Sequence, residues 1–116
     1  MDVNIGGTVM HCEVSGKGAP LLVLHGWGCT GQTMAAVAAG LQGLRTVYSV
    51  DFPGFGQSSP PPTPWSVTEY TDHLLAFMQE AGIEKADIVA HSFGGRVTLL
   101  LAATHPEKVG KIVITM

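Results

Sequence analysis

Ser92 is the residue whose surroundings most clearly predict chemistry. It lies in the sequence HSFGG, between a strand-like apolar run and an apolar helical run. A sharp strand-to-helix turn needs small residues two positions before and two positions after its central residue, and here these are Ala90 and Gly94. Such a turn exposes the serine hydroxyl at a helix N-terminus, where developing negative charge is favoured. The pattern therefore predicts that Ser92 is a nucleophile.

Two backbone N–H groups are predicted to assist this serine. Acyl transfer needs donors aimed at the oxyanion that forms on the substrate. We expect one donor to be Phe93, directly after the nucleophile, and the other to be Trp27, in the loop sequence HGWG. The side chains of Trp27, Phe55 and Phe93 predict an apolar substrate-binding pocket. His25, in the same loop, is interpreted as a structural residue that holds the loop by hydrogen bonds.

The elements that must position these residues alternate between strand and helix. The alternation predicts an α/β fold with a mostly parallel sheet flanked by helices. The run at 21–25 predicts a strand buried on both faces, and the helix at 93–104 is apolar nearly all round, which predicts a buried helix. A loop at 51–65 holds five prolines, and Ser66 and Glu69 after it have the spacing of a capping box. Periodicity and turn signals give strands at 3–5, 8–14, 21–25, 45–50, 86–90 and 111–115, and helices at 33–41, 66–81 and 93–104.

Three segments together resemble a known family. HGWG, then DFPGFGQS beginning at Asp51, then HSFGG are similar in order and spacing to the α/β-hydrolase superfamily, in its small serine esterase-like members. The resemblance covers essentially the whole chain, and it corresponds to the N-terminal half of the family's core, through the sixth strand. It implies that the segment at Asp51 shapes the loop beside the active site and is structural.

The same resemblance implies that the catalytic machinery is incomplete in residues 1–116. The family's triad runs serine, then aspartate or glutamate, then histidine along the chain. Residues 1–116 are therefore expected to be the N-terminal part of a core domain, with the triad acid, the base and the lid absent. We expect this chain alone to be inactive.

None of the five histidines is expected to replace the missing base. His11 lies in the N-terminal hairpin, and His73 is predicted to face solvent from its helix. His105 is at the far end of the helix that follows the nucleophile, and the sharp turn aims His91 away from its neighbour. His25 belongs to the oxyanion loop. No pair has the spacing of metal ligands, so we expect neither a metal nor another cofactor.

The resemblance favours hydrolysis of a small carboxylester through an acyl-enzyme. A serine nucleophile disfavours the dehalogenases and epoxide hydrolases of the same fold, which carry aspartate at that position. Hydrolysis of carbon–carbon bonds, of enol-lactones or of N-terminal proline peptides remains an alternative. A second hypothesis, from another class, is that the 116 residues form a non-catalytic truncated module or an assembly subunit.

Composition excludes several classes of partner. The net charge is −3 and no lysine or arginine cluster is present, so a nucleic-acid partner is not expected. No apolar run is long enough to span a membrane, and the first residues lack the features of a signal peptide, so we expect a cytoplasmic protein. The predicted strand at 111–115 is apolar and would form an open edge of the sheet. It therefore predicts self-association through that edge.

Overall fold

A computed structural model describes residues 1–41 and 43–115 as one six-stranded sheet with helices on both faces. The strand order is β1-β2-β4-β3-β5-β6; β1 and β2 pair antiparallel to their neighbours, and the remaining pairs are parallel. This confirms the predicted fold class. The strands are β1 Asp2–Ile5, β2 Thr8–Gly16, β3 Ala19–Leu24, β4 Arg45–Val50, β5 Ala86–His91 and β6 Val109–Thr115, and the α-helices are α1 Ala35–Leu41, α2 Val67–Glu80 and α3 Phe93–Thr104.

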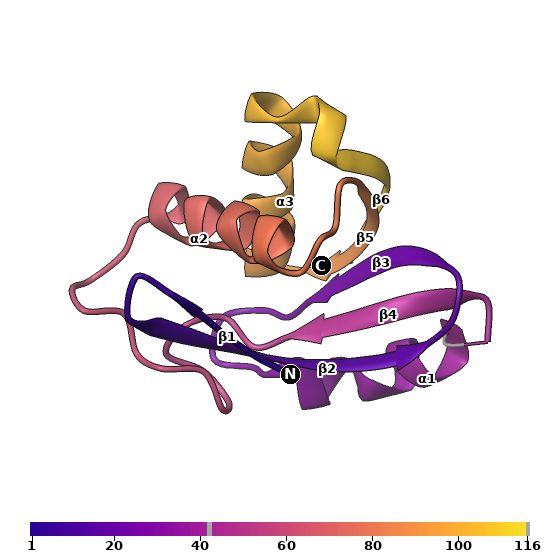
Figure 1. Cartoon of the computed structure of the whole chain (residues 1–116), viewed down its shortest axis with the longest axis horizontal. Helices are drawn as coiled ribbons and strands as arrows, with labels where there is room; N and C mark the ends of the chain where they lie inside the picture. Colours follow the sequence, from indigo (N-terminus) through magenta and orange to yellow (C-terminus); the bar gives the residue numbers. More distant parts are fainter. Residues whose placement is uncertain (42, 116) are drawn as a thin grey trace.

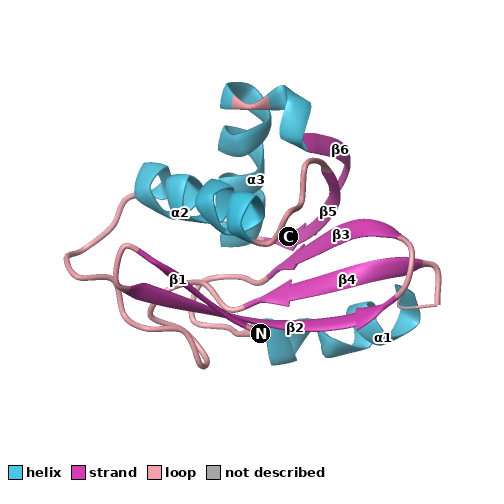
Figure 2. Cartoon of the chain, viewed as in Figure 1, coloured by secondary structure: helices cyan, strands magenta, loops and turns pink. Residues whose placement is uncertain are grey.

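The helices divide between the two faces of the sheet. Figure 1 shows α1 on one face, with α2 and α3 on the other. The larger apolar core lies beneath α2 and α3, and a smaller one, which includes Val23 and Met34, lies beneath α1. Figure 2 shows the loops after β3 and β4 at the end of the sheet where both arrowheads lie. The loops that carry the predicted site therefore gather at the carboxyl ends of the parallel strands, where open α/β sheets bind ligands.

The central strand β3 is buried on both faces, as predicted. Leu22, Val23 and Leu24 have no exposed surface, and β3 lies between β4 and β5 in the sheet. Alternate side chains of this strand enter the two different cores, because successive residues of a strand point to opposite faces. The continuous apolar run is thus explained by burial on both sides.

Helix α2 begins and ends where its local signals place it. Ser66 is the N-cap, and the reciprocal bonds of the capping box with Glu69 are both present. Gly82, just beyond the helix, has a positive φ of 74°, a backbone conformation that glycine adopts without strain. The prediction that His73 faces solvent is wrong, because this side chain is only 7% exposed. Position 73 lies three residues after buried Tyr70, so it shares the apolar face of the helix.

The predictions for the other two helices need correction in detail. Helix α3 is not buried all round: Leu99 is 59% exposed, because only one side of this helix packs on the sheet and on α2. The helix predicted at 33–41 begins instead as a 3₁₀ turn, Gly31–Met34, which continues as α1. At the first residue of this turn, the Gly31 N–H donates to the Asp51 carboxylate at 2.6 Å. None of the described helices has the length and hydropathy that crossing a membrane requires.

Candidate active site

Ser92 occupies the turn between β5 and α3 in a strained backbone conformation. Its φ is 49° and its ψ is −107°, and among the described residues it is the only non-glycine residue with a positive φ. Residues are held in such conformations only when surrounding contacts enforce them, and these positions concentrate at functional sites. The Ser92 N–H donates to the Thr115 carbonyl at 3.0 Å, and its carbonyl accepts from Gly95 N–H at 2.9 Å. These bonds tie the turn to β6 on one side and to α3 on the other.

Small residues flank the turn, and at Gly94 close backbone approach requires one. Ala90 is fully buried within β5. A Cβ placed on Gly94 would lie 2.6 Å from the Leu24 carbonyl oxygen, so no larger residue fits there without moving the backbone. A Cβ placed on Gly26 would lie 3.5 Å from the Cβ of Ser92. The loop after β3 therefore lies directly beside the serine.

The two predicted donors have free backbone N–H groups. Across residues 1–41 and 43–115, neither Trp27 nor Phe93 donates its N–H to another protein group. Both residues belong to segments that adjoin Ser92: Phe93 follows it, and Trp27 follows Gly26. Unbonded N–H groups beside a serine at a helix N-terminus can stabilise negative charge on a bound oxygen.

The structure brings the three predicted pocket side chains together. The ring of Trp27 lies edge-on to Phe55 at 4.8 Å and to Phe93 at 5.1 Å between centroids. Trp27 nevertheless remains 61% exposed, so it forms an apolar surface over the loop and not part of the core. Sequence reasoning missed Tyr70, which contacts Phe93 at 5.3 Å and also Trp27. Its helical periodicity marked Tyr70 only as a core residue.

His25 and Asp51 hold the loops around the site. The Nδ1 of His25 donates to the Gly26 carbonyl at 2.7 Å, and its Nε2 accepts from the Phe52 N–H at 2.9 Å. This pattern requires a neutral imidazole. Burial lowers the pKa of His25, although the bond to Gly26 and the charge of Asp51 oppose the shift. Asp51 accepts from the N–H of Gly31 at 2.6 Å and of Gln57 at 3.0 Å, so its carboxylate is also used in loop structure.

No histidine in the described part of the chain hydrogen-bonds to the Ser92 hydroxyl. His91 pairs with the Thr115 hydroxyl at 2.9 Å, and His105 with the Thr104 hydroxyl at 3.0 Å. The other three are bound or packed elsewhere: His11 contacts Asp2 and Glu13, His25 holds the loop described above, and His73 packs on Trp65. Nor do the described residues include a group of three or more His, Cys, Asp or Glu side chains that could hold a metal ion.

The fold and the turn at Ser92 together define the class of protein, and the chain belongs to the α/β-hydrolase family. The family described as alpha/beta hydrolase fold matches residues 19–116. 2-Hydroxymuconate semialdehyde hydrolase from Pseudomonas sp. (strain CF600) is 38% identical over 105 residues, which are 86% of this chain and 37% of that protein. Fluoroacetate dehalogenase from Burkholderia sp. is 32% identical over 117 residues, which are 97% of this chain and 38% of that protein.

The fold is also that of known hydrolase structures. An enzyme that degrades N-acyl homoserine lactones superimposes with a TM-score of 0.92 at 25% identity, over 98% of this chain and 44% of that one. The chain therefore spans less than half the length of the relatives it matches. These relatives are named as a hydrolase, a dehalogenase and a lactone-degrading enzyme, so membership of the family does not specify the reaction.

Proposed function

We propose that this chain is the nucleophile-bearing part of a serine hydrolase that cleaves a small carboxylic ester through an acyl-enzyme. The observation that carries the proposal is the strained backbone of Ser92, at φ 49°, in a tight strand-to-helix turn with its side chain exposed. Serine at this position favours acyl transfer, because the hydroxyl oxygen forms an ester with the acyl group that water can then hydrolyse.

In the proposed reaction, the Ser92 oxygen attacks the carbonyl carbon of the substrate while its proton passes to a general base. The carbonyl oxygen becomes an oxyanion, which receives hydrogen bonds from the free N–H groups of Trp27 and Phe93. Collapse of this intermediate expels the alcohol, which takes the proton back from the base, and leaves the acyl group on Ser92. Water then gives a proton to the base and attacks the acyl-enzyme; the acid leaves, and the serine oxygen regains its proton from the base. The aromatic rings of Trp27, Phe55 and Phe93 form the apolar surface on which the acyl chain lies.

The general base and the acid that orients it are proposed to come from outside the described residues. The reason is that no described side chain hydrogen-bonds to the Ser92 hydroxyl. A serine hydroxyl without an adjacent base is a weak nucleophile, so catalysis needs the full-length protein in which such groups accompany this chain. We further propose that this protein acts in the cytoplasm on a small molecule.

The proposal is tested by replacing Ser92 in the full-length protein. We expect Ser92→Ala to lower kcat for an aryl ester about 10⁶-fold and to abolish labelling by a fluorophosphonate probe. Ser66→Ala is the matched control, since it removes the same hydroxyl at another helix N-cap. It should lower stability by about 1 kcal/mol and leave labelling intact. Substantial esterase activity or labelling in the Ser92→Ala protein would refute the assignment.

A second candidate is the substrate class of the relative from Pseudomonas sp. That protein is named for 2-hydroxymuconate semialdehyde and is 38% identical to this chain. Comparing kcat/KM of the full-length protein for this compound and for an aryl ester distinguishes the two candidates. Both reactions would use Ser92, so the comparison tests the substrate class and does not test the identity of the nucleophile.

A further inference from the structure

Tyr70 belongs to α2, yet three segments of the site converge on its side chain. Its ring lies edge-on to Phe93 at 5.3 Å and to Trp27 at 5.9 Å between centroids. Its hydroxyl donates a long hydrogen bond, of 3.3 Å, to the Pro53 carbonyl. Trp27 lies in the loop after β3, Pro53 in the loop after β4, and Phe93 at the start of α3. One side chain of α2 therefore joins the segments that surround Ser92.

The rings of Tyr70, Trp27 and Phe93 form a closed triangle. Trp27 and Phe93 also contact each other, at 5.1 Å, and the planes of each pair are 74° or 84° apart. Edge-to-face pairs have a preferred geometry, so each ring restricts the orientation of the other two. Trp27 and Phe93 are also the residues whose free backbone N–H groups are proposed to receive the oxyanion. The triangle thus connects both proposed donors to a third residue, Tyr70.

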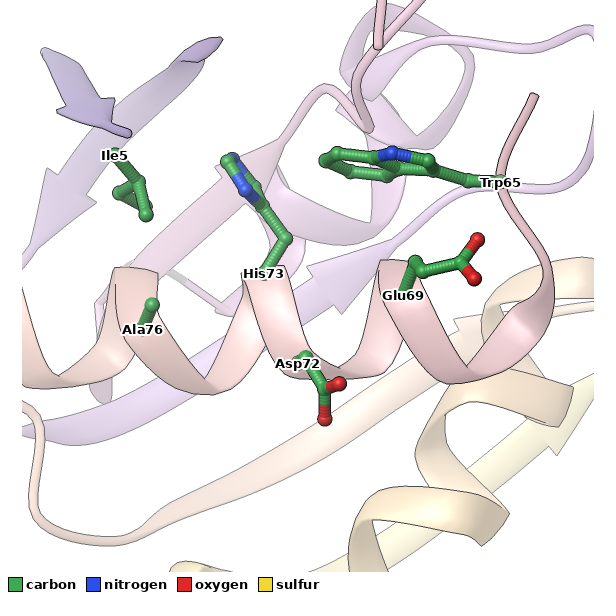
Figure 3. Close-up of a pocket in the computed structure, with 6 residues that line it drawn as sticks. All are labelled: Ile5, Trp65, Glu69, Asp72, His73 and Ala76. Carbon is green, nitrogen blue, oxygen red and sulfur yellow. The ribbon is translucent and has the colours of Figure 1, made fainter. Parts of the chain in front are cut away.

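The Tyr70 side chain is itself held in place. It is 3% exposed, and Trp65 packs edge-on against it at 5.3 Å. Figure 3 shows the Trp65 indole lying over α2 and directed toward His73, on which it also packs. Burial raises the pKa of Tyr70, so its hydroxyl keeps its proton and donates to Pro53. By contrast, Trp27 is 61% exposed, so its orientation depends on neighbours such as Tyr70.

We propose that Tyr70 is a positioning residue, which holds the N–H groups of Trp27 and Phe93 in the orientation that an oxyanion requires. This inference rests on the proposed function, because it gives Tyr70 a part in the same acyl transfer. Tyr70 acts through the two donor residues and does not itself touch the reacting atoms. Displaced donors lose more of their bond to the transition state than to the substrate, because they are aimed at the position where charge develops. Loss of the Tyr70 ring should therefore lower kcat and leave KM nearly unchanged.

The test compares an aryl ester with its thionoester, in which sulfur replaces the carbonyl oxygen, as substrates of the full-length protein. Sulfur accepts hydrogen bonds weakly, so the ratio of the two kcat/KM values reports how well the donors hold an oxyanion. Tyr70→Met fills much of the same space without a ring. We expect it to lower kcat for the ester about 100-fold, to change KM less than about threefold, and to lower the ester-to-thionoester ratio about tenfold.

Two further variants separate positioning from folding. Tyr70→Phe keeps the ring, so kcat and the ratio should stay within about threefold of the parent values. Thr71→Val is the matched control, because the Thr71 hydroxyl lies on the same helix, is equally buried and donates to the Val67 carbonyl at 2.8 Å. Its loss should lower the melting temperature and leave the ratio unchanged. Circular dichroism shows whether each variant is folded at the assay temperature.

The outcomes distinguish this inference from the function on which it rests. If the fluorophosphonate probe does not label Ser92 in the parent, the proposed function fails and the inference fails with it. If Ser92 is labelled, the inference alone is overturned when Tyr70→Met keeps the parent ratio, or when Tyr70→Phe lowers the ratio about tenfold. Tyr70→Leu replaces Tyr70→Met if the methionine variant does not fold, and the same results are expected of it.

Discussion

Replacing Gly94 by alanine tests whether close backbone approach at the start of α3 is what holds the Ser92 turn. The new Cβ would lie 2.6 Å from the Leu24 carbonyl oxygen and 2.9 Å from that of His25. Real Cβ atoms essentially never come closer than 3.0 Å to such an atom, so α3 must move away from β3 by about 0.4 Å. The atoms in the way belong to the backbone of β3 and its loop, which cannot turn aside as a flexible side chain would.

The magnitude follows from two opposing effects. Overpacking of this kind costs about 1–3 kcal/mol, while replacing glycine by alanine within a helix restricts the unfolded chain and stabilises by about 0.4–1 kcal/mol. We therefore expect Gly94→Ala to lower the free energy of unfolding by about 1–2 kcal/mol. Gly40→Ala is the matched control, because α1 offers open space around a Cβ at that position. It should raise the free energy of unfolding by about 0.4–1 kcal/mol.

Urea denaturation followed by circular dichroism measures both changes. In the full-length protein, the same displacement should slow labelling of Ser92 by a fluorophosphonate about tenfold, because it moves the serine and the Phe93 N–H out of register with the substrate. If Gly94→Ala proves at least as stable as the parent while Gly40→Ala behaves as expected, the steric reasoning is refuted.

Three further predictions concern pH, self-association and activity. Burial lowers the pKa of His11, but hydrogen bonds to Asp2 and Glu13 and the charges of these residues outweigh it, so the pKa is raised above 6.5. The stabilisation by protonated His11 is complete below the pKa that this histidine has in the unfolded chain, and it is lost as the pH rises through the folded pKa. In urea titrations, His11→Gln should therefore lower the free energy of unfolding more at pH 5 than at pH 9. Equal losses at the two pH values would refute this. Only β5 pairs with β6 in the described sheet, so we propose that copies associate through this edge. Val113→Lys should reduce association in light scattering, whereas Leu99→Lys, at a similarly exposed residue of α3, should not; equal effects would contradict the edge model. The 116-residue chain alone should hydrolyse aryl esters at no more than the rate of its Ser92→Ala variant, and a clear difference would reveal a base within it.

Local sequence patterns were sufficient to predict the order of elements and the position of the nucleophile turn. The capping box at Ser66 and the glycine stop at Gly82 depend only on residues within one helical turn of each other. The signal for the turn at Ser92 is also local, because the small residues Ala90 and Gly94 flank it within two positions. These signals lie within a few residues of one another, so a single sequence contains them.

The exposure of individual helix residues was less predictable. His73 is predicted from the sequence to face solvent, yet its spacing from Tyr70 and Phe77 places it on the buried face. That spacing is the signal in the sequence that indicates burial of His73. Leu99 shows the opposite case, because a helix that is apolar nearly all round does not indicate which face will meet the sheet.

Contacts between distant segments were decided only by the tertiary structure. The sequence marked His25 as a loop-holding residue, but not that its Nε2 would accept from Phe52, 27 residues later. Likewise, the approach of Gly94 to the Leu24 carbonyl depends on the parallel register of β3 and β5. The sequence alone was sufficient for three conclusions: the family, from the resemblance of three short motifs; the candidate nucleophile, from the turn around Ser92; and the fold class, from the alternation of strands and helices. The surroundings of that nucleophile, and the rings around Tyr70, arise where segments far apart in the chain pack together, and packing geometry is a property of the folded chain as a whole.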